Sequence, residues 1–161
     1  MSVEYSLSDP KQRELASLIL AESDFKEALG HVNCVLRNDV LTTDERLDAF
    51  RAAAIIAYVR PFKKNQGYQR LPASYEEFAE GAFKKLHGEL VDLRDKCIAH
   101  SDSDMNRVVR DRDPSTWKLG RPHPITFALH REGFDLFRGL CQEQLDRLKK
   151  DIETRLAQGN T

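Results

Sequence analysis

The chain has 161 residues, of which 40% are hydrophobic and 32% are charged. This balance is that of one folded domain and excludes a disordered protein, because a chain so rich in apolar residues can bury a core. The formal net charge of -1 gives no overall attraction for nucleic acid, so any such binding must depend on a local basic patch.

The sequence predicts a cytoplasmic protein that does not enter a membrane. Its first residues lack a basic segment followed by an unbroken apolar one, and the longest apolar stretch, Ala52 to Val59, is too short to cross a bilayer. Cys34, Cys97 and Cys141 are odd in number, far apart, and set in apolar periodic stretches. This pattern predicts reduced core cysteines rather than a disulfide framework or a zinc site.

The first predicted helix runs from about Pro10 to Asn38. Asp9 and Pro10 provide a cap and a first-turn proline. Apolar residues then recur at three- and four-residue spacing: Leu15, Leu18, Phe25, Leu29, Val32 and Leu36.

A second helix is predicted after Thr42. Thr42 and Glu45 have the spacing of a capping box, in which each side chain accepts a backbone amide of the first turn. Pro61 lacks an amide hydrogen and blocks continuation, so this helix is expected to end near Arg60.

The third predicted helix carries the most regular amphipathic pattern. Ser74 and Glu77 repeat the capping-box spacing, so the helix is expected to begin at Ser74 and to include Cys97. Its apolar positions are Tyr75, Phe78, Ala82, Leu86, Leu90, Leu93 and Cys97.

A fourth helix is predicted after Gly133, and the segment before it is irregular. Residues 101–130 contain three prolines and a glycine and cannot form one continuous helix. Within them, residues 106–110 and 125–129 are β-prone and are predicted to pair as a short antiparallel ribbon.

These elements predict an all-α fold. Short links between the other helices favour antiparallel neighbours, which is an up-and-down bundle of four main helices with an irregular loop or short β-ribbon between the third and fourth. We expect a single domain over residues 1–161, with a core at about 10–156 and an irregular insertion at about 101–130.

A group of polar residues at the end of the third helix carries the strongest functional signal. Arg94 is followed directly by Asp95 and, after five intervening residues, by His100. The chain here resembles the HEPN family of helical bundles, which are recognised by an arginine, a polar residue after it, and a histidine four to six residues beyond. The stretch from Tyr58 to Phe62 also looks like a feature of some uncharacterised HEPN-like proteins.

The resemblance implies a metal-independent endoribonuclease with no cofactor. Attack of a ribose 2'-hydroxyl on the neighbouring phosphate needs a group that exchanges protons near neutral pH and a fixed cation for the phosphoryl oxygens. By the resemblance His100 is the general acid or base, Arg94 holds the phosphate, and Asp95 orients one of them.

The spacing of Arg94 and His100 bears on how such a site is assembled. At about 100° per residue, an offset of six residues leaves the two side chains about 120° apart around a helix. Either the helix unwinds before His100, or two copies of the motif meet across a twofold axis, as in the family's dimers. We favour the homodimer.

A basic group follows the second helix and is a candidate for binding the RNA substrate. It consists of Arg60, Lys63, Lys64 and Asn65, which suit phosphate groups. Solvated loop charges are the alternative. His87 lies within about 20° of Arg94 on the helix, so it either lines the same cleft or is a histidine at the core boundary.

Three possibilities remain open. The leading hypothesis is a homodimer that cleaves or binds RNA through Arg94 and His100, as a toxin or defence component of a two-component system. The alternative is a non-catalytic module in which the same polar patch binds a nucleotide or a protein, such as an antitoxin or a nucleotidyltransferase-type partner. The third is a structural helical bundle, in which Arg94 pairs with a carboxylate and His100 caps helix carbonyls.

Overall fold

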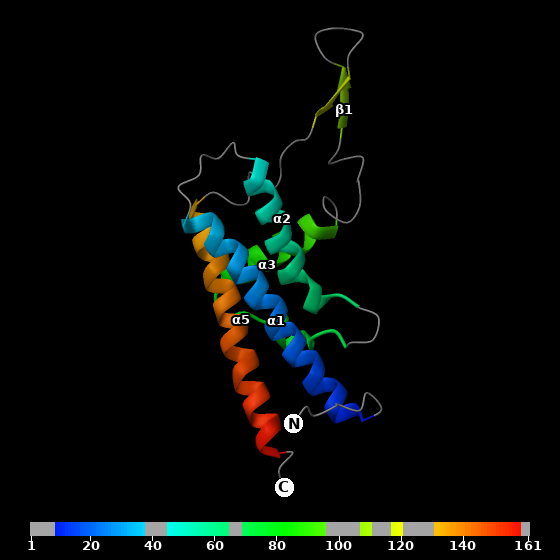
Figure 1. Cartoon of the computed structure of the whole chain (residues 1–161), viewed down its shortest axis with the longest axis vertical. Helices are drawn as coiled ribbons and strands as arrows, with labels where there is room; N and C mark the ends of the chain where they lie inside the picture. Colours follow the sequence, from blue (N-terminus) through cyan, green and yellow to red (C-terminus); the bar gives the residue numbers. More distant parts are fainter. Residues whose placement is uncertain are drawn as a thin grey trace.

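The computed structural model describes residues 9–37, 45–64, 69–95, 107–110, 117–120 and 131–158. The described α-helices are α1 (Pro10–Arg37), α2 (Glu45–Val59), α3 (Gly81–Leu93) and α5 (Arg131–Gln158). Two short 3₁₀ turns, η1 (Arg60–Phe62) and η2 (Ala73–Glu76), and the strands β1 (Arg107–Arg110) and β2 (Trp117–Gly120) complete the described elements (Figure 1). The prediction of an all-α helical bundle is confirmed.

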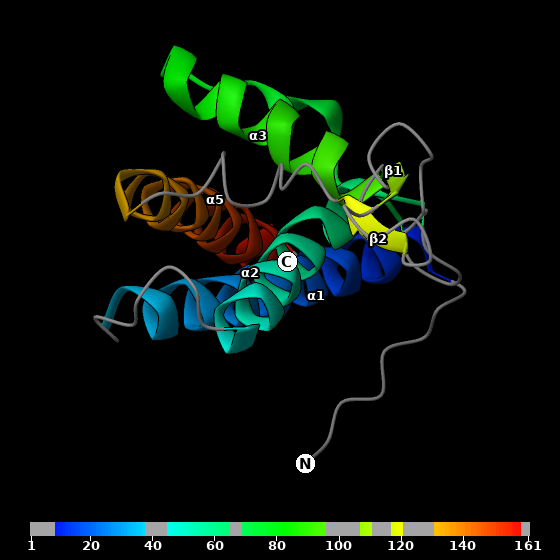
Figure 2. The same ribbon diagram turned by 90° about the horizontal axis from the view of Figure 1, so that it is seen from above.

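The helices are arranged around one core. Helix α1 packs along both α5 and α2, and α3 contacts α2 and α5. Figure 2 shows the bundle from above: α3 lies on one side and α1 on the other, with α5 between them and α2 overlapping α1 in this view. None of the helices in the described part of the chain is both long and apolar enough to span a bilayer.

Helix α1 begins where the sequence predicts. The Asp9 carboxylate accepts the backbone N–H of Lys11 at 3.0 Å, and the Asp9 carbonyl accepts that of Arg13 at 2.9 Å. These bonds satisfy amides that have no partner inside the helix. The buried face of α1 repeats every three or four residues and consists of Ser17, Leu18, Ala21, Phe25, Ala28 and Val32.

Helix α2 ends at Val59, within one residue of the prediction. Pro61 then occupies the first turn of η1, where its missing N–H costs no hydrogen bond. The backbone becomes extended at Lys63, which donates its N–H to the carbonyl of Arg60 at 3.2 Å. The predicted cap at Thr42 lies outside the described residues.

The prediction that the third helix begins at Ser74 is wrong. Ser74 lies in η2, and α3 starts at Gly81 without a side-chain cap. Two side chains of α5 account for the difference: Arg147 donates to the carbonyls of Ser74 and of Glu77, the latter at 3.1 Å. Gln144 donates to the carbonyl of Tyr75 at 2.8 Å. Carbonyls bound in this way by another helix do not need the amides of a helix of their own.

The partner of the first predicted strand also differs. β1 pairs in antiparallel register with β2, from Arg107 opposite Gly120 to Arg110 opposite Trp117. Residues 125–129, the predicted partner, lie outside the described residues. A connection of six residues between the strands closes at a smaller entropic cost than the longer connection that was predicted.

Helix α5 begins two residues before Gly133, and this glycine is used inside the helix rather than as its boundary. A second glycine of α5, Gly139, has a packing role. A Cβ at this position would lie 3.2 Å from the ring of Phe83, so the absent side chain lets α3 approach α5 closely.

Aromatic rings form the centre of the core. Phe25 of α1 and Tyr58 of α2 have ring centroids 5.5 Å apart, and Phe62 and Phe137 lie 5.6 and 5.3 Å from Tyr58. One of the predicted core cysteines, Cys141, is buried here, whereas Cys34 is exposed on α1, so the prediction of a core position is wrong for Cys34. Cys97 lies outside the described residues.

Replacement of a core ring tests this arrangement. Phe25→Ala deletes a side chain that is 0% exposed and contacts two other rings, so the free energy of unfolding should fall by about 3–5 kcal/mol. Phe50→Ala is the matched control, because Phe50 is 37% exposed, and a loss below about 1 kcal/mol is expected. Urea denaturation followed by circular dichroism measures both, and equal losses would contradict the packing described.

Candidate functional site

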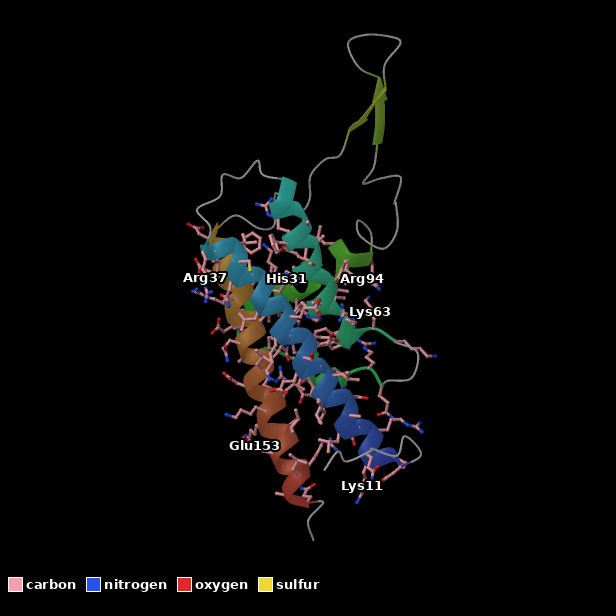
Figure 3. The ribbon with its side chains drawn as sticks, viewed as in Figure 1. Lys11, His31, Arg37, Lys63, Arg94 and Glu153 are labelled. Atoms are coloured by element: carbon pink, nitrogen blue, oxygen red, sulfur yellow. The ribbon has the colours of Figure 1, made fainter. Side chains whose placement is uncertain are left out.

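Three side chains meet at the C-terminal end of α3. Lys63 donates from Nζ to Oδ2 of Asp95 at 2.5 Å, and Arg94 donates from a terminal guanidinium nitrogen to Oδ1 at 2.9 Å. We call Lys63, Arg94 and Asp95 the α3-end cluster. Figure 3 shows Lys63 and Arg94 on the same side of the molecule. The first comes from the extended segment after η1 and the second from α3, so only the packing of these elements brings them together.

The α3-end cluster is open to solvent and carries excess positive charge. The side chains of Lys63, Arg94 and Asp95 are 28%, 33% and 39% exposed. Partial burial disfavours the Asp95 carboxylate, but the hydrogen bonds from Lys63 and Arg94 outweigh it and hold the pKa of Asp95 below its ordinary value. At neutral pH two cations therefore share one anion, which leaves one positive charge in excess.

The predicted basic group after α2 is divided between two surroundings. Arg60 donates to Asp24 at 2.5 Å and lies 3.4 Å from Glu27, both on α1, so its charge is matched by carboxylates. Lys63 belongs to the α3-end cluster, and Lys64 is exposed. Asn65 lies outside the described residues.

His100, the predicted proton-transfer residue, also lies outside the described residues, which end at Asp95 on this part of the chain. Arg94 retains helical backbone angles and donates its N–H to the carbonyl of Leu90. The structure therefore describes the cationic part of the predicted site, formed by Arg94, Asp95 and Lys63.

His87 is more deeply placed than either sequence interpretation allowed. It is 7% exposed, and its ring lies 4.6 Å from that of Phe62 and 5.2 Å from that of Phe78, measured between centroids. Its Nδ1 is 3.0 Å from the Tyr58 hydroxyl, and its Nε2 is 3.6 Å from the Glu76 carboxylate. His87 is therefore a hydrogen-bonded core residue that joins α3 to α2, η1 and η2.

Burial determines the protonation of His87. Loss of solvation lowers its pKa, Glu76 opposes this effect, and the charges of Arg70 and Lys63 add to it. The net result is a pKa below the ordinary value of a histidine, so the ring is neutral at pH 7. Burial also raises the pKa of Tyr58, which keeps its hydroxyl proton available as a donor.

Sequence reasoning missed the partners of His87. Glu76 ion-pairs with Arg70 and faces Nε2 of His87, yet no spacing rule links residues 70, 76 and 87. The available signal was the i,i+7 relation of His87 to Arg94, which places both on one face of α3. Tyr58 and Phe62, whose rings pack on His87, are both buried.

A hollow lies between α1 and the segment from η1 to Leu71. It has a volume of about 260 Å³, and its wall includes Leu20, Leu71 and the Asp24–Arg60 pair. Burial raises the pKa of Asp24, although Arg60 partly offsets this. Among the described residues, no three His, Cys, Asp or Glu side chains are grouped so as to hold a metal ion.

The comparisons with known proteins add nothing to this geometry. No protein-family model, curated protein or solved structure matches the chain.

Acidification should lower the free energy of unfolding through protonation of His87. Because the folded-state pKa of His87 lies below the unfolded value of about 6.5, the unfolded chain takes up the proton first. Above the unfolded pKa, neutral His87 makes its full contribution to the free energy of unfolding. This contribution is lost as the pH falls toward the lower pKa of the folded state. Urea unfolding from pH 8 to pH 5 should show this decline in the wild type, and His87→Phe should show a smaller decline. Identical pH dependence of the two proteins would refute it.

Proposed function

We propose that the chain is a HEPN-like RNA-binding protein that holds RNA phosphates at the α3-end cluster and cleaves the RNA, without a metal ion, through His100. The observation that supports this proposal is the pairing of two partly exposed cations, Lys63 and Arg94, around one carboxylate at the end of α3. Such a patch supplies the local positive charge that a protein of net charge -1 needs in order to bind RNA.

The contact with Asp95 suits Arg94 to bind a phosphate. One guanidinium nitrogen is engaged by Asp95, and this contact restricts the rotation of the long side chain. A guanidinium has further N–H donors, which match the geometry of phosphate oxygens. Preorganised cations of this kind stabilise the charge that develops on the phosphoryl group during in-line attack.

His100 completes the proposed reaction. Its imidazole, five residues after Asp95, exchanges protons near neutral pH, as removal of the 2'-hydroxyl proton or protonation of the leaving oxygen requires. We further propose that two chains form a homodimer and that each contributes a motif to a shared cleft. In this arrangement Arg94 of one chain can serve the same phosphate as His100 of the other.

Incubation of the purified protein with a mixed RNA pool in EDTA tests the proposal. The wild type should produce fragments with 2',3'-cyclic phosphate ends, and His100→Ala should lower the rate by about a hundredfold or more. Arg94→Gln should weaken RNA binding by about tenfold, since a charge-assisted phosphate contact is lost. Fluorescence anisotropy measures the binding.

Arg138→Gln is the matched control, because Arg138 is also bound to an aspartate at 2.9 Å but lies on α5. It should leave cleavage and binding unchanged. Equal effects of Arg94→Gln and Arg138→Gln would show that the α3-end cluster is not the RNA site. RNA that is bound through Arg94 but remains intact would remove the catalytic half of the proposal and favour a binding module.

A further inference from the structure

The apolar face of α3 does not by itself determine the rotation of the helix. This face is formed by Leu86, Leu90 and Leu93, which are 3%, 0% and 6% exposed. Contacts between apolar side chains are less directional than hydrogen bonds, so close packing limits the rotation of α3 without specifying it as sharply as a buried polar contact does. A directional contact is needed to define which way the remaining faces of α3 point.

His87 supplies such a contact. Its neutral form with the proton on Nε2 accepts the Tyr58 hydroxyl at Nδ1 and turns its N–H toward Glu76. The bond to Tyr58 is made in a buried site, where an unpaired polar group is costly, whereas Glu76 is partly exposed and lies 3.6 Å from Nε2. Rotation of α3 would break the bond to Tyr58, and the ring of Phe62, edge-on to His87 at 4.6 Å, would also be displaced.

The residues that contact His87 are close in the sequence to members of the α3-end cluster. Phe62 packs on His87, and the next residue, Lys63, contacts Asp95, which lies eight residues after His87 and just past the end of α3. Arg94 follows His87 by seven residues, which places the two within about 20° around the helix. Asp95 follows His87 by eight residues, about 80° around the helix, so the rotation that His87 defines also sets the direction of Asp95, which Lys63 contacts.

We infer that His87 is a positioning residue for the α3-end cluster, acting through its bond to Tyr58 and its packing on Phe62 to set the face of α3 that meets Lys63. Its consequence for RNA rests on the proposed function, but its consequence for the Lys63–Asp95 contact does not. His87 does not touch the substrate and takes no part in proton transfer.

A double variant separates positioning from simple support of the fold. His87→Phe alone keeps a ring but leaves the Tyr58 hydroxyl buried without its acceptor, which destabilises the protein. Adding Tyr58→Phe removes that hydroxyl and should recover stability. The double variant then has an apolar contact between α2 and α3 but lacks the directional bond.

Two readouts are measured on this double variant. The first is the pKa of Asp95, from a carbon-detected NMR titration of the full chain, with Lys63→Gln as the reference for a lost Lys63 contact. The second is RNA affinity by fluorescence anisotropy. Leu148→Ala, at a buried position on α5, is the control for general destabilisation and should change neither readout.

We expect the double variant to unfold near the wild-type midpoint, with the pKa of Asp95 raised toward the Lys63→Gln value and RNA affinity about tenfold weaker. A stable double variant with a wild-type Asp95 pKa and full RNA affinity would overturn the inference. If the wild type binds no RNA but the double variant still has a raised Asp95 pKa, the positioning role is upheld and the proposed function is refuted.

If the double variant does not fold, Tyr58→Phe alone is measured. A raised Asp95 pKa in this variant supports the inference, and an unchanged one overturns it.

Discussion

The hydrogen bond between Tyr58 and His87 couples the elements that carry the candidate site. It joins α2 to α3 inside a group of aromatic rings, and the ring of Phe62 from η1 packs against both partners. A buried hydroxyl or imidazole without a hydrogen-bond partner destabilises the folded state. A movement of α2 relative to α3 that breaks this bond is therefore unfavourable. The relative placement of Lys63 and Arg94 follows from this constraint.

Helix α5 contributes to the same arrangement from the other side. Gln144 and Arg147 bind backbone carbonyls of residues 74–77, and Asp151 accepts the Tyr75 hydroxyl at 2.5 Å. These bonds hold η2 against α5 and present Glu76 to His87. The turn that replaces the expected first part of the third helix thus supports the histidine from which the α3-end cluster takes its orientation.

Carboxylates decide which cations of the chain are left in excess. Among the described residues, Arg60 has two acidic neighbours on α1, whereas the carboxylate that Lys63 and Arg94 share is that of Asp95. The α3-end cluster therefore carries one excess positive charge. Since the cluster is partly exposed, dissolved salt screens its charge.

The sequence by itself determined the helices and the pattern of their buried faces, because caps, proline and apolar periodicity act within a few residues of the chain. It also singled out Arg94 and Asp95, which are neighbours in the sequence. Only the tertiary structure decided that residues 73–76 form a 3₁₀ turn, that Arg60 pairs with carboxylates of α1, and that Lys63 contacts Asp95 beside Arg94. These features depend on contacts between residues that are far apart in the sequence, such as Arg147 with Ser74 and Tyr58 with His87. A local sequence pattern does not indicate which distant side chain will bind a given carbonyl, hydroxyl or charged group.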